Sequence, residues 1–369
     1  MSAPGRVLVA GTGLIGTSIA LALREAGTEV WLSDADPATA KLAADLGAGT
    51  VVPDLRDAKG IADVAVLAMP PAVVGRELAR AQEFAVADAY TDVASVKVLP
   101  ARQARELGCD LETYVPGHPL AGRERHGPAA AQADLFLGRT WALCPLPETS
   151  PGAVDLVTAL AVACGADPVL TDPMTHDSWV ALVSHAPHLV AAAMAARLAP
   201  PGVSAGALSL AGQGLRDVTR VAAGDSALWT QILSANAGPV AEVVAAVAED
   251  LAAAARLLAR LAPQAPAAGA GPAGVTSLLD RGQAGAGRIP GKHGGQPRNF
   301  TVVQVVLADR PGELARLFNA AGAAGVNIED IRLEHSPGLP VGVAELSVRP
   351  EHAGLLLDAM EAGGWPVRR

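Results

Sequence analysis

Short apolar runs alternate with segments of helical length from residue 6 to residue 170. This alternation is typical of βαβ units, in which parallel strands form one sheet and helices cover its faces. The runs that we expect to be strands span residues 6–10, 29–33, 64–69, 89–92, 113–116, 140–144 and 168–170. The pattern therefore predicts an α/β domain built on a parallel sheet over residues 1–171.

Two long alanine-rich segments follow, at residues 175–198 and 239–261. In the second segment, apolar side chains recur at steps of three and four residues, which places them on one face of a helix. This apolar stripe consists of Val240, Val243, Val244, Val247, Leu251, Ala254, Leu258 and Leu261. Because such a stripe needs a partner surface, we predict an all-helical domain over residues 172–262 that joins two copies of the chain in a homodimer.

The remaining residues divide into an irregular part and a patterned part. Residues 263–298 carry much of the excess of Pro, Gly and Ala, which predicts a linker or an ordered irregular arm. Residues 299–369 resume as strand, helix, strand, strand, helix and short strand. The first of these helices is expected over residues 313–324, where Gly325 can end it in a left-handed conformation. A βαββαβ unit of this kind predicts a ferredoxin-like α+β domain.

Composition and charge exclude several classes of protein. The chain has 369 residues, of which 50% are hydrophobic and 18% charged, so wholesale disorder is not expected. The formal net charge of -9 argues against a nucleic-acid partner, which needs clustered cationic side chains. The first residues lack the regions of a signal peptide, and no apolar run of about 18 residues free of charges and helix breakers predicts a membrane span.

The candidate metal ligands do not form a convincing set. Cys109, Cys144 and Cys164 are odd in number and show no CxxC spacing, which fits a reducing compartment and predicts a cytoplasmic protein. His185 and His188 lie three residues apart on one face of an expected helix, a spacing that two zinc ligands could use. With no obvious third ligand beside them, we predict no metal site.

A glycine-rich turn joins the first expected strand to an apolar helix in the sequence VLVAGTGLIG. In this context Gly11 permits a tight turn, Gly13 lets the backbone approach a pyrophosphate, and Gly16 allows close helix packing. A turn without a ligand is the alternative reading. We expect contacts to a dinucleotide from Gly11, Thr12, Gly13, Leu14, Ile15 and Gly16.

Asp34 follows the second expected strand, where a carboxylate can accept hydrogen bonds from a ribose diol and would repel the 2′-phosphate of NADP. No arginine lies between Asp34 and Lys41 to hold that phosphate, so NAD is the predicted cofactor. Met69, the last residue of the expected strand 64–69, completes the predicted cofactor site.

Further candidates lie after later strands and on the expected helices. Ser95 in TDVASVK and His118 in GHPLAG follow strand ends, the edge at which open parallel sheets bind ligands. A histidine before a proline in a turn is often structural, so this alternative stays open for His118. Arg220 belongs to a helical segment on which arginines usually face solvent, and the pattern alone gives it no role.

The chain resembles the prephenate dehydrogenase family in a series of segments that occur in the family's order. These segments are GTGLIGTS, DVASVK, GHPLAGRE, ADLFLGRTWALCP, SHAPHL, RDVTRVA and LWTQILSAN. RIPGKHG, DRPGELARLF and GVNIEDIR resemble the version of that family with a C-terminal ACT domain, and only about residues 262–287 stay unmatched. The resemblance implies a Rossmann dinucleotide-binding domain at residues 1–171, a helical substrate and dimerisation domain at 172–262, a linker at 263–298 and an ACT regulatory domain at 299–369.

The same resemblance implies NAD-dependent oxidative decarboxylation of prephenate to 4-hydroxyphenylpyruvate, a step of tyrosine biosynthesis. His118 matches the catalytic histidine, whose imidazole has a pKa suited to taking the proton of the 4-hydroxyl. Ser95 matches a serine that positions the hydroxyl and the nicotinamide. Arg220 matches the arginine expected to hold a substrate carboxylate. The other expected pocket residues are His188, Glu124 and, as a weaker candidate, His185.

One departure and three alternatives remain open. Arg123 stands after HPLAG where a small or hydroxyl residue is expected, which leaves a local change in carboxylate recognition open. Arogenate, the amino analogue of prephenate, undergoes the same chemistry, so an arogenate dehydrogenase is the main alternative. β-Hydroxyacid and imine reductases share the fold pattern but lack the GHPLAG and SHAPH pair. A regulator that binds NAD and an amino acid without catalysis is a further alternative.

The C-terminal segment suggests an effector site. DRPGEL forms a turn from strand to helix, in which Gly312 leaves backbone N–H groups open to a ligand carboxylate. Asn327 and Ile328, in the GVNI turn, could contact the ligand across an interface between two such modules. Tyrosine or a related aromatic amino acid is the expected effector, and a purely assembling role is the alternative.

Overall fold

The computed structural model describes residues 2–122, 126–261, 273–289, 300–335 and 340–368. Their contacts divide the chain into two compact units, Met1–Ala248 and Glu249–Arg369. Each unit is described by itself.

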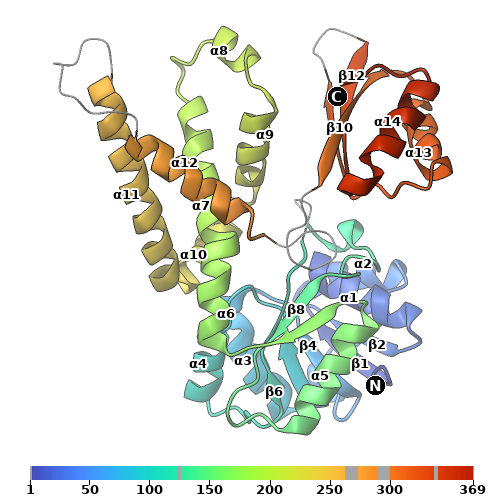
Figure 1. Cartoon of the computed structure of the whole chain (residues 1–369). Coiled ribbons are helices and arrows are strands. Elements are labelled where there is room, and N and C mark those ends of the chain that lie inside the picture. The colour runs from blue at the N-terminus through green and yellow to red at the C-terminus, as the bar shows by residue number, and fades with distance from the viewer. Residues whose placement is uncertain (1, 123–125, 262–272, 290–299, 336–339, 369) are drawn as a thin grey trace. The chain divides into compact units, whose positions relative to one another are not determined.

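The first unit is built on a six-stranded parallel sheet of order β3-β2-β1-β4-β5-β6 (Figure 1). Its strands are β1 Arg6–Ala10, β2 Glu29–Ser33, β3 Thr50–Val51, β4 Ala62–Leu67, β5 Ala87–Asp92 and β6 Tyr114–Val115. The predicted strands are confirmed to within a few residues at their ends, and the two-residue β3 was missed. A strand this short carries too little alternation to be recognised.

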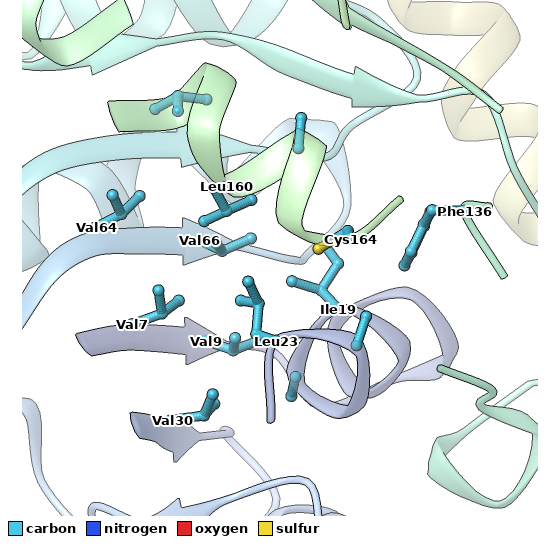
Figure 2. Close-up of a cluster of buried hydrophobic side chains, with 14 of the residues drawn as sticks. Val7, Val9, Ile19, Leu23, Val30, Val64, Val66, Phe136, Leu160 and Cys164 are labelled. Carbon is cyan, nitrogen blue, oxygen red and sulfur yellow. The ribbon is translucent and has the colours of Figure 1, made fainter. Parts of the chain in front are cut away.

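Helices cover both faces of this sheet. They are α1 Leu14–Glu25, α2 Pro37–Asp45, α3 Pro71–Glu83, α4 Val98–Glu106 and α5 Pro151–Ala163. Alternate side chains of the strands face opposite sides, so Val7 and Val9 of β1 pack with α1 and α5, while Leu8 packs with α3 and α4. Figure 2 shows the first of these cores, in which Leu160 lies beside Val66 and Ile19 lies near Cys164.

A second, three-stranded sheet follows, and it differs from the prediction. It consists of β7 Gly117–Pro119, β8 Thr140–Leu143 and β9 Asp167–Leu170, with β7 antiparallel to β8. The expected strands 140–144 and 168–170 therefore exist but do not join the parallel sheet. The strand that carries His118 was not predicted, because three residues that end in a proline give no period to detect.

The helical part of this unit begins with one long rod (Figure 1). It runs through α6 Pro173–Val180, a π-helical turn Ala181–His185 and α7 Ala186–Ala195. Pro187 has no N–H to close the ordinary helical bond, and the N–H of Ala186 instead bonds to the carbonyl of Ala181. The rod is followed by α8 Ala205–Ser209, α9 Gln213–Arg220, α10 Ser226–Ala235 and α11 Ala237–Leu261.

The helical run Pro173–Leu198 has 26 residues and a mean hydropathy of 1.4 in its most apolar window, enough by length and composition to cross a membrane. The sequence had predicted no such span. We interpret the run as a helix of the folded domain, because it carries the buried polar side chains of His176, Asp177 and His185. These side chains are hydrogen-bonded to groups of other elements or of each other.

The predicted linker contains a helix. Residues 263–298 include α12 Ala273–Ala286, which packs against the second half of α11, where Arg281 Nη2 donates to Asp250 Oδ1 at 2.7 Å. This helix is rich in Gly and Ala, so its periodicity was too weak to be recognised in the sequence. The apolar stripe of α11 is largely uncovered by the described residues, since Leu251 and Leu258 are both more than half exposed.

The C-terminal sheet domain has the predicted order of elements. Its antiparallel sheet is ordered β11-β12-β10-β13, and two helices pack against one face. The elements are β10 Thr301–Ala308, α13 Glu313–Ala323, β11 Asp330–His335, β12 Val341–Val348, α14 Ala353–Ala362 and β13 Val367–Arg368. Gly325 has φ +70°, the left-handed conformation expected after α13.

Candidate active site

The glycine-rich turn lies between β1 and α1, and its glycines serve two different purposes. A Cβ on Gly11, which has φ +97°, would lie 2.2 Å from the carbonyl oxygen of Ala68, and one on Gly16 would lie 1.9 Å from that of Gly11. A Cβ on Gly13 would have no neighbour within 4 Å. Gly13 also caps α1 without a side-chain hydrogen bond. The first turn of α1 therefore faces open space, as the pyrophosphate of a dinucleotide requires.

Asp34 lies beside this turn, directly after β2. The main-chain N–H and the hydroxyl of Thr12 donate to Asp34 Oδ2 at 2.6 and 2.9 Å, and the N–H of Asp36 donates to Oδ1 at 2.9 Å. The carboxylate thus holds the turn in place. Its contact with a ribose diol stays a prediction.

A pocket of about 570 Å³ connects the glycine-rich turn with the ends of the strands and with α10. Gly13 and Gly16 lie in its wall together with Met69, Ser95 and His118. These five predicted residues, far apart in sequence, therefore share one cavity with Leu14 and Ile15. The wall also contains polar or aromatic side chains to which the sequence assigned no role, namely His126, Asp225 and Trp229.

His118 lies on β7, partly buried, and its imidazole is hydrogen-bonded on the side of Nδ1. His118 Nδ1 lies 2.9 Å from His176 Nε2, and the two rings meet edge to face. Burial of the ring lowers the pKa of His118 well below 6.5, and the positive charge of Lys97 lowers it further. The imidazole is therefore neutral at pH 7 and can accept a proton.

Beneath β7 lies a buried charged cluster that the sequence did not reveal. The ammonium of Lys97 contacts Asp92 and donates to the carbonyl oxygen of Gly117 at 2.5 Å. The hydroxyl of Tyr114 donates to the other oxygen of Asp92 at 2.7 Å. Because Gly117 directly precedes His118, this cluster fixes the backbone that carries the imidazole. The motif DVASVK contains both charged residues, but only their burial reveals this role.

The two histidines of the π-helical region pack around Trp229. His188 is stacked on the indole with 3.5 Å between ring centroids, and His185 meets its edge at 6.1 Å. Burial lowers the pKa of His185 to about 4 and also lowers the pKa of His188. Gly224 packs against the stack, since a Cβ there would lie 2.6 Å from the indole nitrogen. Neither histidine lines the pocket.

Two predicted substrate residues lie elsewhere. Arg220 is exposed at the end of α9 and is not in the pocket wall, and Glu124 lies outside the described residues, as does Arg123. Among the residues that the structure describes, no group of three or more His, Cys, Asp and Glu side chains could hold a metal ion.

Comparison with known proteins identifies the family. Residues 19–170 match the family model of the prephenate dehydrogenase nucleotide-binding domain, and residues 172–264 match that of the prephenate dehydrogenase dimerization domain. The probable prephenate dehydrogenase NovF from Streptomyces niveus is 40% identical over 365 residues, which cover 98% of this chain and 98% of the relative. The chain belongs to the prephenate dehydrogenase family.

Other similar proteins match between about three fifths and three quarters of the chain. The prephenate dehydrogenase of Bacillus subtilis is 32% identical over 242 residues, covering 62% of this chain and 64% of the relative. The Aquifex aeolicus enzyme, solved with hydroxyphenyl propionate and NAD+, has a TM-score of 0.65 and 26% identity over 76% of this chain and 96% of its own. The structure of Synechocystis arogenate dehydrogenase has a TM-score of 0.62 and 25% identity, and the match covers 76% of this chain and 98% of its own.

As a member of the prephenate dehydrogenase family, this protein is an NAD-dependent oxidoreductase of tyrosine biosynthesis, as the sequence predicted. The predicted cofactor is confirmed by the nucleotide-binding domain and by the solved relative with NAD+. The match of residues 172–264 to a dimerization domain supports the expected homodimer.

Proposed function

We propose that this dehydrogenase oxidises and decarboxylates prephenate to 4-hydroxyphenylpyruvate, with His118 as the base. The observation that carries the proposal is the place of His118, whose neutral imidazole shares the 570 Å³ pocket with the turn Gly13–Gly16. The base must lie within hydrogen-bond reach of the substrate hydroxyl, and the carbon that carries this hydroxyl must lie against the cofactor. This pocket contains both the imidazole and the glycine-rich turn.

The chemistry divides between the cofactor and the side chains. Bound NAD, held by the glycine-rich turn and Asp34, supplies the acceptor for the hydride that leaves carbon 4 of the ring. His118 takes the proton of the 4-hydroxyl, so that this carbon becomes a carbonyl. The bond to the ring carboxylate then breaks, carbon dioxide leaves, and the bonding electrons make the ring aromatic. The proton held by His118 returns to the phenolate oxygen.

Ser95 is assigned to positioning in this proposal. It lies in the loop after β5, in the same pocket wall as His118. Its hydroxyl can both donate and accept a hydrogen bond, which suits a contact with the 4-hydroxyl and with the nicotinamide amide. No neighbouring base activates it as a nucleophile among the described hydrogen bonds, so we assign no covalent step to it.

The two carboxylates of prephenate need fixed cations. The lowered pKa values of His118, His185 and His188 leave these rings neutral at pH 7 and unable to serve as cations. We therefore assign carboxylate binding to Arg220, with His188 and Glu124 as further polar contacts, as the family resemblance implies. Arg220 is the last residue of α9, which packs against α7, the helix that carries His188.

The substrate choice is tested by direct comparison. Purified protein is offered prephenate or arogenate, each with NAD or NADP, while reduced nicotinamide and carbon dioxide are followed. We expect the highest kcat/KM with prephenate and NAD. A higher value with arogenate would identify the alternative substrate, and release of neither product would contradict a catalytic role.

We also propose that the C-terminal sheet domain is an ACT domain that binds tyrosine or a related aromatic amino acid. Gly312, with φ +84°, lies in the wall of a hollow of about 460 Å³ formed by the turn before α13. Ile328 lies in the wall of a separate hollow of about 680 Å³, and the Asn327 amide donates to Glu329 at 3.0 Å. In this proposal the effector binds between the Gly312 turn of one module and the Asn327 turn of a second.

A homodimer in the cytoplasm completes the proposal. The exposed apolar residues of the α6 to α7 rod and of α11 offer the surface that a partner copy would cover. The three cysteines are free thiols in the structure, which fits a reducing compartment.

A further inference from the structure

A chain of hydrogen bonds leads from His118 to a buried carboxylate. His176 and Asp177 are neighbours on α6, and each is only 2% exposed. His176 Nε2 lies 2.9 Å from His118 Nδ1, and His176 Nδ1 lies 2.8 Å from Asp177 Oδ1. Neither residue lines the pocket, so both can influence the substrate only through the residues that they hold in place.

The carboxylate sets the direction of this chain. The main-chain N–H of Lys97 donates to Asp177 Oδ1 at 2.7 Å, and that of Val98 donates to Oδ2 at 2.9 Å. A carboxylate held in this way is an acceptor, so the proton in its bond to His176 belongs to Nδ1 of the ring. A ring whose single proton lies on Nδ1 presents Nε2 as an acceptor, here toward His118.

We propose that His176 and Asp177 are positioning residues that hold His118 in the tautomer protonated at Nδ1. The inference rests on the proposed function of His118 as a base. In this tautomer the bond to His176 takes the Nδ1 proton, and the lone pair on Nε2 is left for the substrate hydroxyl. When Nε2 accepts the proton of that hydroxyl, the charge formed on His118 is stabilised through the His176 ring by the carboxylate of Asp177.

The same carboxylate places Ser95 relative to His118. Lys97 and Val98, whose N–H groups bond to Asp177, come shortly after Ser95 at the start of α4. The Asp177 carboxylate therefore holds the segment that follows Ser95 and also orients His176, the ring that contacts the base His118. A change at Asp177 would alter both, so the cleaner test is made at His176.

The charges around His118 determine how its protonation responds to such a change. The groups that face it are His176 and Asp177 of α6, Asp92 at the end of β5, Lys97 directly before α4, His185 of the π-helical turn and His126 of the pocket wall. The acceptor at position 176 favours the protonated form of His118, whereas burial opposes it. Loss of the acceptor should therefore lower the pKa of His118 further.

The test compares two replacements of His176 in the full chain. His176→Leu removes the acceptor, and we expect kcat to fall by about thirtyfold or more with little change in the Kd for NAD. The acid limb of the kcat/KM profile should move to lower pH. His176→Gln keeps an oxygen near the position of Nε2 and should restore kcat to within about fivefold of the parent.

Controls separate positioning from folding. His352→Leu, in the C-terminal sheet domain, is the matched change away from the site and should leave kcat and the pH profile as in the parent. The Kd for NAD and the melting temperature show whether each variant is folded. A kcat of His176→Leu within about threefold of the parent, with an unshifted acid limb, would overturn the proposal. So would failure of His176→Gln to restore kcat while NAD binding is intact.

A second measurement needs no substrate. Long-range proton to nitrogen-15 couplings in the full chain labelled at histidine report the tautomer of each ring. We expect protonation at Nδ1 alone for both His118 and His176 at pH 7. His118 protonated at Nε2, or a doubly protonated His176, would overturn the inference. If both tautomers are as expected but neither prephenate nor arogenate reacts, the proposed function fails and the tautomer assignment stands.

Discussion

At the scale of single residues, the chemistry depends on keeping His118 neutral and open to the pocket. Burial and nearby positive charges lower its pKa well below 6.5. The lowered pKa destabilises the protonated imidazole that forms during the reaction, but it keeps the ring unprotonated at neutral pH and so able to act as a base. Two predictions belong to this scale.

His118→Ala should lower kcat by about a hundredfold or more, the usual contribution of a positioned base, while the Kd for NAD changes little. In the parent, activity should fall as pH drops, because protonated imidazole cannot accept the hydroxyl proton. The midpoint should lie below pH 6.5, since the folded protein lowers the pKa of His118. Steady-state kinetics from pH 5 to pH 8 check both points, and a midpoint above 6.5 would contradict the environment described for the ring.

Arg220→Ala should mainly raise KM for the substrate, because an ion pair with a carboxylate stabilises the ground state and the transition state alike. We expect an increase of about tenfold or more with a smaller change in kcat. Arg220→Lys is the matched variant and should recover part of the loss, since it keeps the charge but not the two-pronged geometry. Unchanged KM for both prephenate and arogenate would remove Arg220 from the site.

At the scale of elements, the turn between β1 and α1 combines two demands that its glycines divide between them. Gly11 and Gly16 allow backbone segments to approach more closely than a Cβ permits, whereas Gly13 faces open space. The first demand concerns folding and the second concerns the cofactor. Substitution by alanine can therefore separate them.

Gly16→Ala should destabilise the nucleotide-binding domain, because its Cβ would meet a backbone oxygen that cannot move away freely. Gly13→Ala should leave the melting temperature within a few degrees of the parent but weaken NAD binding by about tenfold or more, since the added methyl occupies the approach of the pyrophosphate. Thermal unfolding and calorimetric titration with NAD measure the two effects. Equal NAD affinity in Gly13→Ala and the parent would refute the assigned path of the cofactor.

At the scale of the whole molecule, the chain divides into a catalytic unit and a unit that ends in the C-terminal sheet domain. The described pocket and the bonds of His118 lie entirely within the first unit. Regulation by an amino acid would require different affinities for two states of the assembly. This organisation predicts that catalysis and response to an effector can be separated.

Removal of the chain from about residue 292 should leave kcat within about threefold of the parent, because no described catalytic contact is lost. It should abolish any inhibition by tyrosine, phenylalanine or tryptophan. Calorimetric titration of the full chain with each amino acid, together with kinetics of both forms, provides the measurement. If none of them binds and the kinetics stay unchanged, assembly is the better account of the C-terminal domain.

The amino-acid sequence by itself determined the features that depend on local pattern. These features are the strands of the parallel sheet, the glycine-rich turn and the βαββαβ order of the C-terminal domain. Each is encoded in a short stretch of sequence, because hydrophobic periodicity and the preferences of turn residues depend on neighbouring positions. Even His118 and Ser95 could be named from their place after strands. The glycine-rich turn and Asp34 predicted the cofactor, and motif resemblance added the reaction, which no periodicity contains.

Only the tertiary structure decided which side chains meet. His176 lies 58 residues from His118 in sequence, and a histidine beside an aspartate on a helix gives no sign of its partner. In the sequence Lys97 has the pattern of an ordinary surface lysine, and only the structure shows that it is buried against Asp92. Likewise β8 has a normal strand pattern, but its membership of the second sheet depends on pairing with β7. Burial and hydrogen-bond partners arise from long-range packing, which a local pattern cannot specify.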